Sequence, residues 1–119
     1  MARYIDGFVI PVRKAKLAAY RRLALIGARV WMKHGALAYC ECVGDDLASS
    51  WGTPFPQQMR LKKGETALFS WILYRSKAHR KSVNAKVMKD PAMDKMMGKP
   101  MPFDMKRMCV GGFAVLVEA

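Results

Sequence analysis

Three polar residues with the potential for chemistry lie close together in the segment 76–89. His79, Arg80 and Asn84 are spaced so that they lie along one side of a helix, next to an apolar stripe that should face a sheet. A histidine, a guanidinium group and an amide in that position would line a binding pocket, and the histidine could transfer a proton. The competing interpretation is structural: His79 takes no part in chemistry, and Arg80 is hydrogen-bonded to Asn84 below the surface.

Asp6 is a further candidate because its carboxylate interrupts an apolar strand, between Ile5 and Phe8. In a dry pocket it would act as a general base. Alternatively it pairs with a cation, and Arg107 on the expected last strand is the partner that we predict. We favour the ion pair, because an unpaired buried carboxylate is costly.

The cysteines, methionines and histidines of the chain give weaker evidence for a functional site. Cys40 and Cys42 are too far apart along a strand for an unstrained disulfide, and no second pair of ligands follows at zinc spacing. Seven of the ten methionines lie within residues 88–108, where we expect them to fill gaps in the packing. The chain has only two histidines and neither a Ser/His/Asp set nor a glycine-rich phosphate loop, so we expect no metal and no cofactor.

The elements that must position these residues alternate between strand and helix patterns. Runs rich in β-branched and aromatic residues predict strands, and apolar residues at helical spacing predict helices. Their order predicts one α+β domain over residues 1–119, a ferredoxin-like βαββαβ fold with a four-stranded antiparallel sheet and two main helices on one face. The expected strands are 4–12, 36–43, 66–75 and 107–117; the expected helices are 14–34, 76–89 and a short one at 91–98, and a long loop covers 44–64.

The expected strand at 66–75 is apolar on both faces. Phe69 and Trp71 point to one face, whereas Leu68 and Ile72 point to the other. Two amphipathic helices can cover only one of them, and monomers rarely expose an apolar patch of more than roughly several hundred Å2. We therefore expect a homodimer in which a second copy covers the remaining face.

Positive charge is concentrated in two segments of this chain, whose net charge is +12. Residues 13–33 carry seven Lys or Arg and no acid, and residues 75–89 carry six and no acid. We expect two solvated helix faces and no nucleic-acid ligand, because no nucleic-acid motif or array of stacking aromatics accompanies the charge. No apolar stretch is long enough for a membrane span, the N-terminus lacks a signal-peptide pattern, and the three cysteines are an odd number, so we expect a cytoplasmic protein without membrane contact.

Several runs of residues together resemble a bacterial family of unknown function, the YbaA-like proteins, over essentially the whole chain. They are DGFV at 6–9, FSWI at 69–72, SKAHR at 76–80, VNAKVMKDP at 83–91, KRM at 106–108 and GGF at 111–113. The resemblance implies a dimeric α+β barrel, in the superfamily of antibiotic-biosynthesis monooxygenases and haem-degrading oxygenases. Trp71, His79 and Asp6 are the nearest counterparts of the residues that line the pocket of the haem-degrading members. The family itself has no assigned activity.

Three hypotheses about function follow, and the question of whether the protein is an enzyme stays open. The first is a dimeric barrel that binds a small molecule, as a cofactor-independent monooxygenase- or isomerase-like enzyme. Its pocket would lie between the sheet and the helix at 76–89, where Gly7, Gly111 and Gly112 leave room beside Trp71, Phe8 and Phe113. The second is a non-enzymatic module whose basic helices bind an anionic partner. The third is a haem-binding, oxygenase-like variant.

Overall fold

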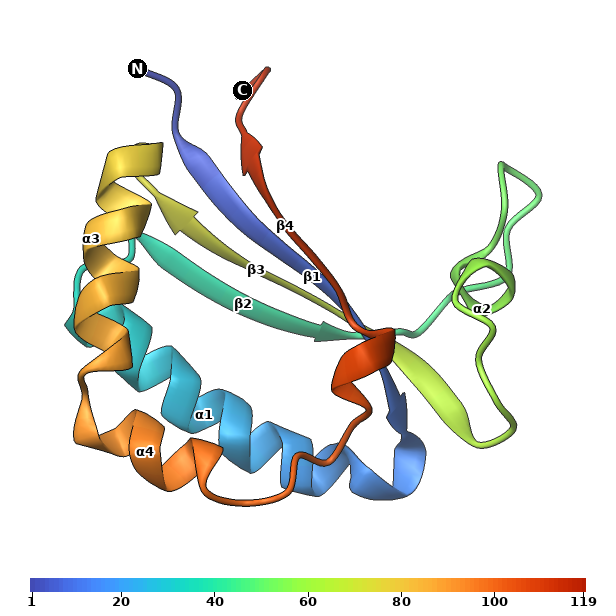
Figure 1. Cartoon of the computed structure of the whole chain (residues 1–119). Helices are drawn as coiled ribbons and strands as arrows, with labels where there is room; N and C mark the ends of the chain where they lie inside the picture. The colour runs from blue at the N-terminus through green and yellow to red at the C-terminus, as the bar shows by residue number, and fades with distance from the viewer.

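A computed structural model describes all residues of the chain, 1–119. Its sheet has the strand order β2-β3-β1-β4, and every neighbouring pair is antiparallel. The predicted α+β fold with a four-stranded antiparallel sheet is confirmed (Figure 1). The strands are β1 (Tyr4–Arg13), β2 (Ala38–Val43), β3 (Glu65–Tyr74) and β4 (Cys109–Ala114); the helices are α1 (Leu17–Lys33), α2 (Phe55–Gln58), α3 (Lys77–Met88) and α4 (Pro91–Met97), with 3-10 turns η1 (Lys14–Lys16) and η2 (Met105–Arg107).

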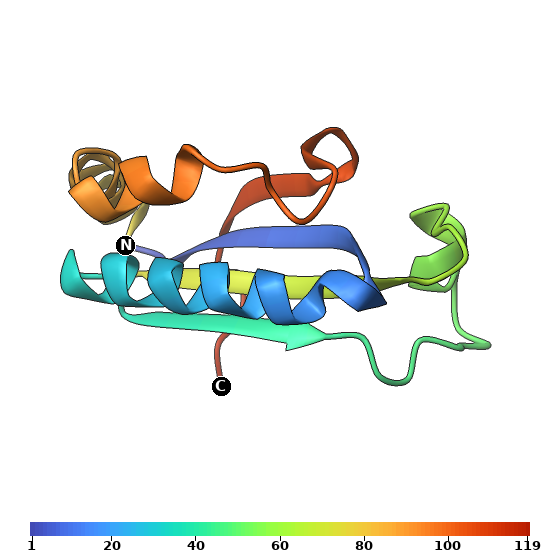
Figure 2. The same ribbon diagram turned by 90° about the horizontal axis from the view of Figure 1, so that it is seen from below.

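Helices α1, α3 and α4 all lie on one side of the sheet, and the other face carries no helix (Figure 1). Seen from below, α1 and α4 run beside each other under the strands, and the segment that contains α2 projects beyond one end of the sheet (Figure 2). No helix has the length and the apolar character that a membrane span requires.

Capping explains where the helices begin. The Ser76 hydroxyl accepts the N–H of His79 at 3.1 Å and starts α3, and the Asp90 carboxylate accepts the N–H of Ala92 at 2.9 Å and starts α4. The start of α1 has no side-chain cap, and the turn η1 leads into it instead. Gly35, with a φ of 107°, reverses the chain after α1.

The core lies between the sheet and the helices, because β1 and β3 turn alternate side chains to this side. Tyr74, Val83 and Val87 are fully buried in one part of it, and Ile10, Val12 and Leu68 form the other. The predicted alternation along residues 66–75 is confirmed: Leu68 and Ile72 are buried, whereas Phe69 remains 50% exposed.

The last strand is shorter than predicted. Residues 105–107 form the turn η2, and β4 ends at Ala114. Beyond it the chain continues beside the N-terminus, where the N–H of Val115 donates to the carbonyl of Arg3 at 2.9 Å and Arg3 pairs with Glu118. This ion pair links the two ends of the chain.

Candidate functional site

The structure places the residues singled out in the sequence on opposite sides of the sheet. Asp6, Arg80 and Asn84 come together on the helix side, whereas Trp71 and Phe113 lie on the open face. Because Trp71 pairs with Gly7 in the register, it is next to Asp6 along the sheet but points the other way. The sheet therefore separates Trp71 from Asp6.

Asp6 is 4% exposed and is paired with Arg80 of α3. The Arg80 Nε atom lies 2.8 Å from the Oδ1 atom of Asp6, but its N–H does not point at this oxygen. The N–H donates instead to the Oδ2 atom of Asp6 at 3.1 Å. The Tyr74 hydroxyl is 3.0 Å from the same oxygen. The ion pair expected for Asp6 is present, but the predicted partner Arg107 is wrong, since Arg107 pairs with Glu65, which lies beside Arg13 at the other end of β1.

Asn84 joins this group to α1. Its Oδ1 atom accepts the indole N–H of Trp31 at 3.1 Å and lies 3.2 Å from the Tyr74 hydroxyl. Burial and the charge of Asp6 raise the pKa of Tyr74, which keeps this phenol neutral. The predicted hydrogen bond between Arg80 and Asn84 is therefore absent, because each of these residues contacts other partners. Together these side chains brace β1, β3, α1 and α3.

His79 belongs to the turn between β3 and α3. Its Nδ1 atom accepts the N–H of Arg75 at 3.0 Å, and its ring meets the edge of Tyr74 with 6.1 Å between the centroids. Burial, with the positive charge of Arg75, lowers the pKa of His79. The helix side of the sheet holds this ring, so His79 and Trp71 do not share a pocket.

Arg107 forms a bidentate pair with Glu65 at the start of β3. The two nitrogen–oxygen distances are 2.7 and 2.8 Å, and a third contact reaches the carbonyl of Arg60 at 3.2 Å. Hydrogen bonds from Arg107 lower the pKa of Glu65 to about 2. This arrangement fastens η2 to β3 and leaves Arg107 engaged within the chain.

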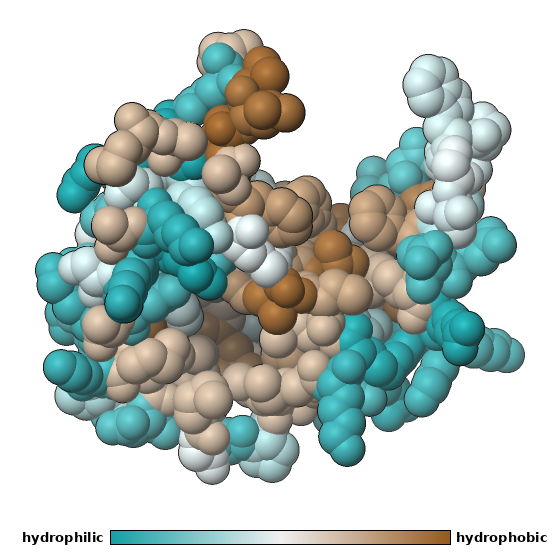
Figure 3. All heavy atoms as spheres, turned by 45° about the horizontal axis from the view of Figure 1, so that its top comes forward, coloured by the Kyte–Doolittle hydropathy of each residue, from teal (hydrophilic) through white to brown (hydrophobic).

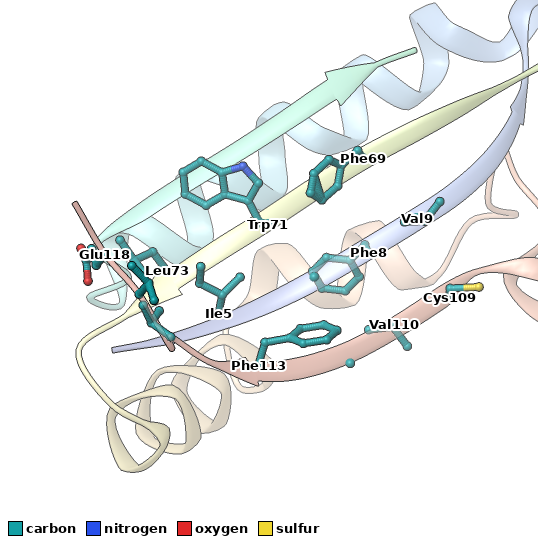
Figure 4. A pocket seen from close by; sticks show the side chains of 14 residues that line it. Ile5, Phe8, Val9, Phe69, Trp71, Leu73, Cys109, Val110, Phe113 and Glu118 are labelled. Atoms are coloured by element: carbon teal, nitrogen blue, oxygen red, sulfur yellow. The ribbon is translucent and has the colours of Figure 1, made fainter. Parts of the chain in front are cut away.

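The open face of the sheet forms a shallow apolar hollow of about 660 Å3. Figure 3 shows apolar side chains gathered over this hollowed surface, and Figure 4 shows Trp71, Phe69 and Phe113 projecting from it. A methyl group on Gly7 would lie 3.2 Å from the ring of Phe113, so this ring already fills the space that the glycine leaves. Phe8 borders the hollow through its backbone position, but alternation along β1 turns its ring to the helix side, where it packs against the core and away from Trp71 and Phe113.

A second cavity, the inner cavity, lies between the sheet and α1 and has a volume of about 160 Å3. Apolar side chains form most of its wall, and Glu41 of β2 supplies a carboxylate. The Tyr20 hydroxyl donates to Oε1 of Glu41 at 2.8 Å, and the Tyr39 hydroxyl donates to Oε2 at 2.7 Å. Burial, and then the charge of Glu41, raise the pKa of both tyrosines, so both phenols stay neutral donors.

Glu41, Tyr20 and Tyr39 were not among the residues predicted to form a site. The sequence nevertheless holds a signal: Glu41 stands between Cys40 and Cys42 in a strand, so alternation turns the acid to the face opposite the two thiols. That face is the one covered by α1. An acid on the covered face of an edge strand needs partners from a helix, and Tyr20 is such a partner.

Two solved structures resemble the chain in fold. Rv0793 from Mycobacterium tuberculosis superimposes with a TM-score of 0.60 at 17% identity and covers 99% of both chains. A dimeric ferredoxin-like protein from an uncultured marine organism gives a TM-score of 0.54 at 10% identity, over 98% of this chain and 99% of the other. At these identities the likeness establishes the ferredoxin-like fold alone.

Sequence comparison identifies the family. Residues 3–105 match the family model described as "Protein of unknown function (DUF1428)". The uncharacterized protein YbaA of Escherichia coli K12 is 40% identical over 116 residues, which is 98% of each chain, and YbaA of Shigella flexneri gives the same values. The resemblance seen in the sequence is therefore confirmed, and the chain belongs to the DUF1428 family, in which YbaA is a relative of matching length.

Proposed function

We propose that the protein is a homodimeric barrel that binds a small molecule in the inner cavity, between the sheet and α1. One observation carries the proposal: a carboxylate, Glu41, is held by two neutral phenols inside a mostly apolar cavity. Binding sites for small molecules have this composition, with mostly apolar walls and a few polar groups in set positions. The site differs from the one expected between the sheet and α3, where side-chain contacts within the protein occupy Asp6, Arg80 and Asn84.

The open face supports the dimer. It exposes large apolar residues of β3 and β4, among them Phe69 at 50% and Phe113 at 62%. A second copy packed sheet to sheet would remove them from water, which is the arrangement of aligned sheets in layered folds. The ferredoxin-like neighbour described as dimeric lends further support. In this proposal residues 1–119 act as one domain that uses one sheet face for the partner and the other for the ligand.

The two alternative functions have less support. A haem site that used Trp71 and His79 would need both in one pocket, whereas the sheet lies between them. An anionic partner would be attracted by the charge of α1 and α3, but no feature beyond this charge favours one. We keep the cytoplasm as the proposed location because three unpaired thiols suit a reducing compartment.

Thermal unfolding of the purified protein in the presence of a panel of small metabolites and haem tests the proposal. A ligand of the folded state raises the melting temperature by mass action. We expect at least one metabolite to do so, and Ala24→Leu, which places a larger side chain in the cavity wall, to remove the effect. Ala18→Leu on the exposed side of α1 is the matched control and should keep it. Absence of any shift, or a shift that survives Ala24→Leu, would contradict ligand binding in this cavity.

A further inference from the structure

The inner cavity holds a negative charge without a positive partner. Glu41 takes part in none of the five ion pairs of the chain, and no Lys, Arg or His lines the cavity. This is unusual in a protein with a net charge of +12, in which cations outnumber acids at the surface. Glu41 is half-buried, and holding a partly buried carboxylate without a cation costs free energy that hydrogen bonds offset in part.

The two phenols leave Glu41 able to accept more hydrogen bonds. Each oxygen of an ionised carboxylate has about two acceptor positions, and Tyr20 and Tyr39 use one on each oxygen. The remaining positions suit a donor from a ligand. Both phenols donate, so a ligand that also accepts hydrogen bonds gains little here, whereas a ligand that brings a positive charge meets an unpaired anion.

Aromatic rings and thioethers form much of the wall around this carboxylate. Trp31 and Tyr39 lie with their ring centroids 6.2 Å apart, and Tyr20 and Phe103 lie edge to face at 5.7 Å. Ring faces attract organic cations through their quadrupoles, most strongly where water is excluded. Methionines 96, 101 and 108 also line the cavity and adapt to irregular ligands.

Gly27 indicates that the position of the Tyr39 hydroxyl matters. A methyl group on this residue would lie 2.9 Å from that hydroxyl, so an alanine in the middle of α1 would press against the end of the Tyr39 side chain. Glycine inside a helix costs about 1 kcal/mol relative to alanine. Glycine at this position leaves room for the hydrogen bond from Tyr39 to Glu41.

From these contacts we propose that the inner cavity binds a compact organic cation, an alkylammonium or quaternary ammonium compound. Glu41 is its counter-ion, and the rings of Trp31, Tyr20 and Tyr39 surround its apolar body. The inference rests on the proposed function, since it names the class of ligand for the same cavity.

Matched pairs of probes test the class of ligand. Choline and benzylamine are titrated against their uncharged counterparts, 3,3-dimethylbutan-1-ol and benzyl alcohol, by calorimetry and by tryptophan fluorescence. The fluorescence is read in the variant with Trp51→Phe and Trp71→Phe, so that the signal comes from Trp31, which lines the cavity. We expect at least one cation to bind roughly tenfold or more tightly than its counterpart, which corresponds to about 1.4 kcal/mol.

Glu41→Gln should remove this preference, because it keeps the shape of the side chain and deletes its charge. Asp46→Asn, which removes one negative charge from an exposed loop, should leave the preference unchanged. If the uncharged probes bind equally well, or Glu41→Gln keeps the preference, the ligand class is wrong and small-molecule binding stands. If neither these probes nor the metabolite panel bind, both proposals fail.

Discussion

At Asp6, a carboxylate inside the protein depends on two partners from distant parts of the chain. Arg80 supplies the charge and Tyr74 supplies a hydrogen bond, while Asn84 and Trp31 extend the contacts to α1. These contacts tie Asp6 to α3 within the protein, although its Oδ1 atom has an ion-pair contact and no hydrogen bond. We therefore interpret Asp6 as a structural residue that holds α3 against β1.

Asp6→Ala should lower the free energy of unfolding by about 2 kcal/mol. Loss of one member of a buried ion pair costs more, about 3–5 kcal/mol, but the Arg80 side chain is 34% exposed and can turn toward water. Tyr74→Phe, which removes only a hydrogen bond, should cost about 1 kcal/mol. Urea unfolding of the two variants measures both effects. Equal stability of Asp6→Ala and the wild type would refute the structural interpretation.

The Glu65–Arg107 pair predicts a pH dependence of stability. Glu65 has a pKa of about 2 in the folded protein, against an ordinary value of 4.5, so the folded state binds its proton less readily than the unfolded state. The stabilisation is complete above about pH 4.5 and is lost as the pH falls toward 2. It should amount to roughly 1 kcal/mol, as for a well-formed pair near the surface.

Unfolding by urea at several pH values between 2 and 6 checks this expectation. The stability of Glu65→Gln should fall less steeply over the lower part of that range than the stability of the wild type. Asp46→Asn, at an exposed acid outside any ion pair, serves as the control and should follow the wild type. Identical slopes for Glu65→Gln and the wild type would show that the pair contributes nothing in solution.

Among the elements, one polar side chain links the end of α1 to the start of α4, beside the apolar packing of Val30 and Met93. Asp90 caps α4 through the N–H of Ala92, and it also contacts Lys33 at 3.1 Å and His34 at 2.7 Å at the end of α1. The backbone hydrogen bond, followed by those from His34 and Lys33, lowers the pKa of Asp90. The short helix α4 is thereby attached to the long one.

Asp90→Ala should loosen α4 while the sheet stays intact. Hydrogen exchange of the amides of α4 should become several-fold faster, because both the cap and the contacts with α1 are lost. Asp90→Ser keeps a capping oxygen but lacks the charge, so its exchange should fall between those of the wild type and the alanine variant. Unchanged exchange in α4 after Asp90→Ala would contradict this role.

For the whole molecule, the open face determines the state of assembly that we expect. A sheet with helices on one side has a second apolar face, and its aromatic residues remain exposed in the single chain. Aligned packing of two such faces would bury the hollow, because side chains of one sheet fit between those of the other. The ligand cavity, on the other side of the sheet, would stay accessible in the dimer.

Phe69→Glu should convert the dimer into a monomer, because it places a charge in the middle of the apolar face. Light scattering after gel filtration measures the mass, which should be twice that of the 13.4 kDa chain for the wild type and that of one chain for the variant. Met88→Glu, at an exposed apolar residue of α3, is the control and should remain dimeric. A wild-type protein of single-chain mass would refute the dimer.

The order of the elements and the faces of the strands were accessible from the residues because both depend on local patterns. Alternation at period two places Leu68 below the sheet and Phe69 above it, whatever the rest of the chain does. Helix starts such as those at Ser76 and Asp90 are likewise local, since the capping contact spans only two or three residues. The fold class and the family therefore follow from residue patterns that can be recognised without the structure.

Contacts between elements could not be inferred in this way. Arg80 and Arg107 are equally cationic, and only the position of α3 beneath β1 assigns Asp6 to Arg80. The sequence alone does not predict Glu41 as a site residue. Its surroundings depend on Tyr20, which α1 places over it, and on Gly27, which leaves room for Tyr39. Such partners are separated by tens of residues, so their distances depend on how the helices pack against the sheet. Local sequence patterns determine the sheet and its helices, whereas the cavity forms only when the helices pack against the sheet.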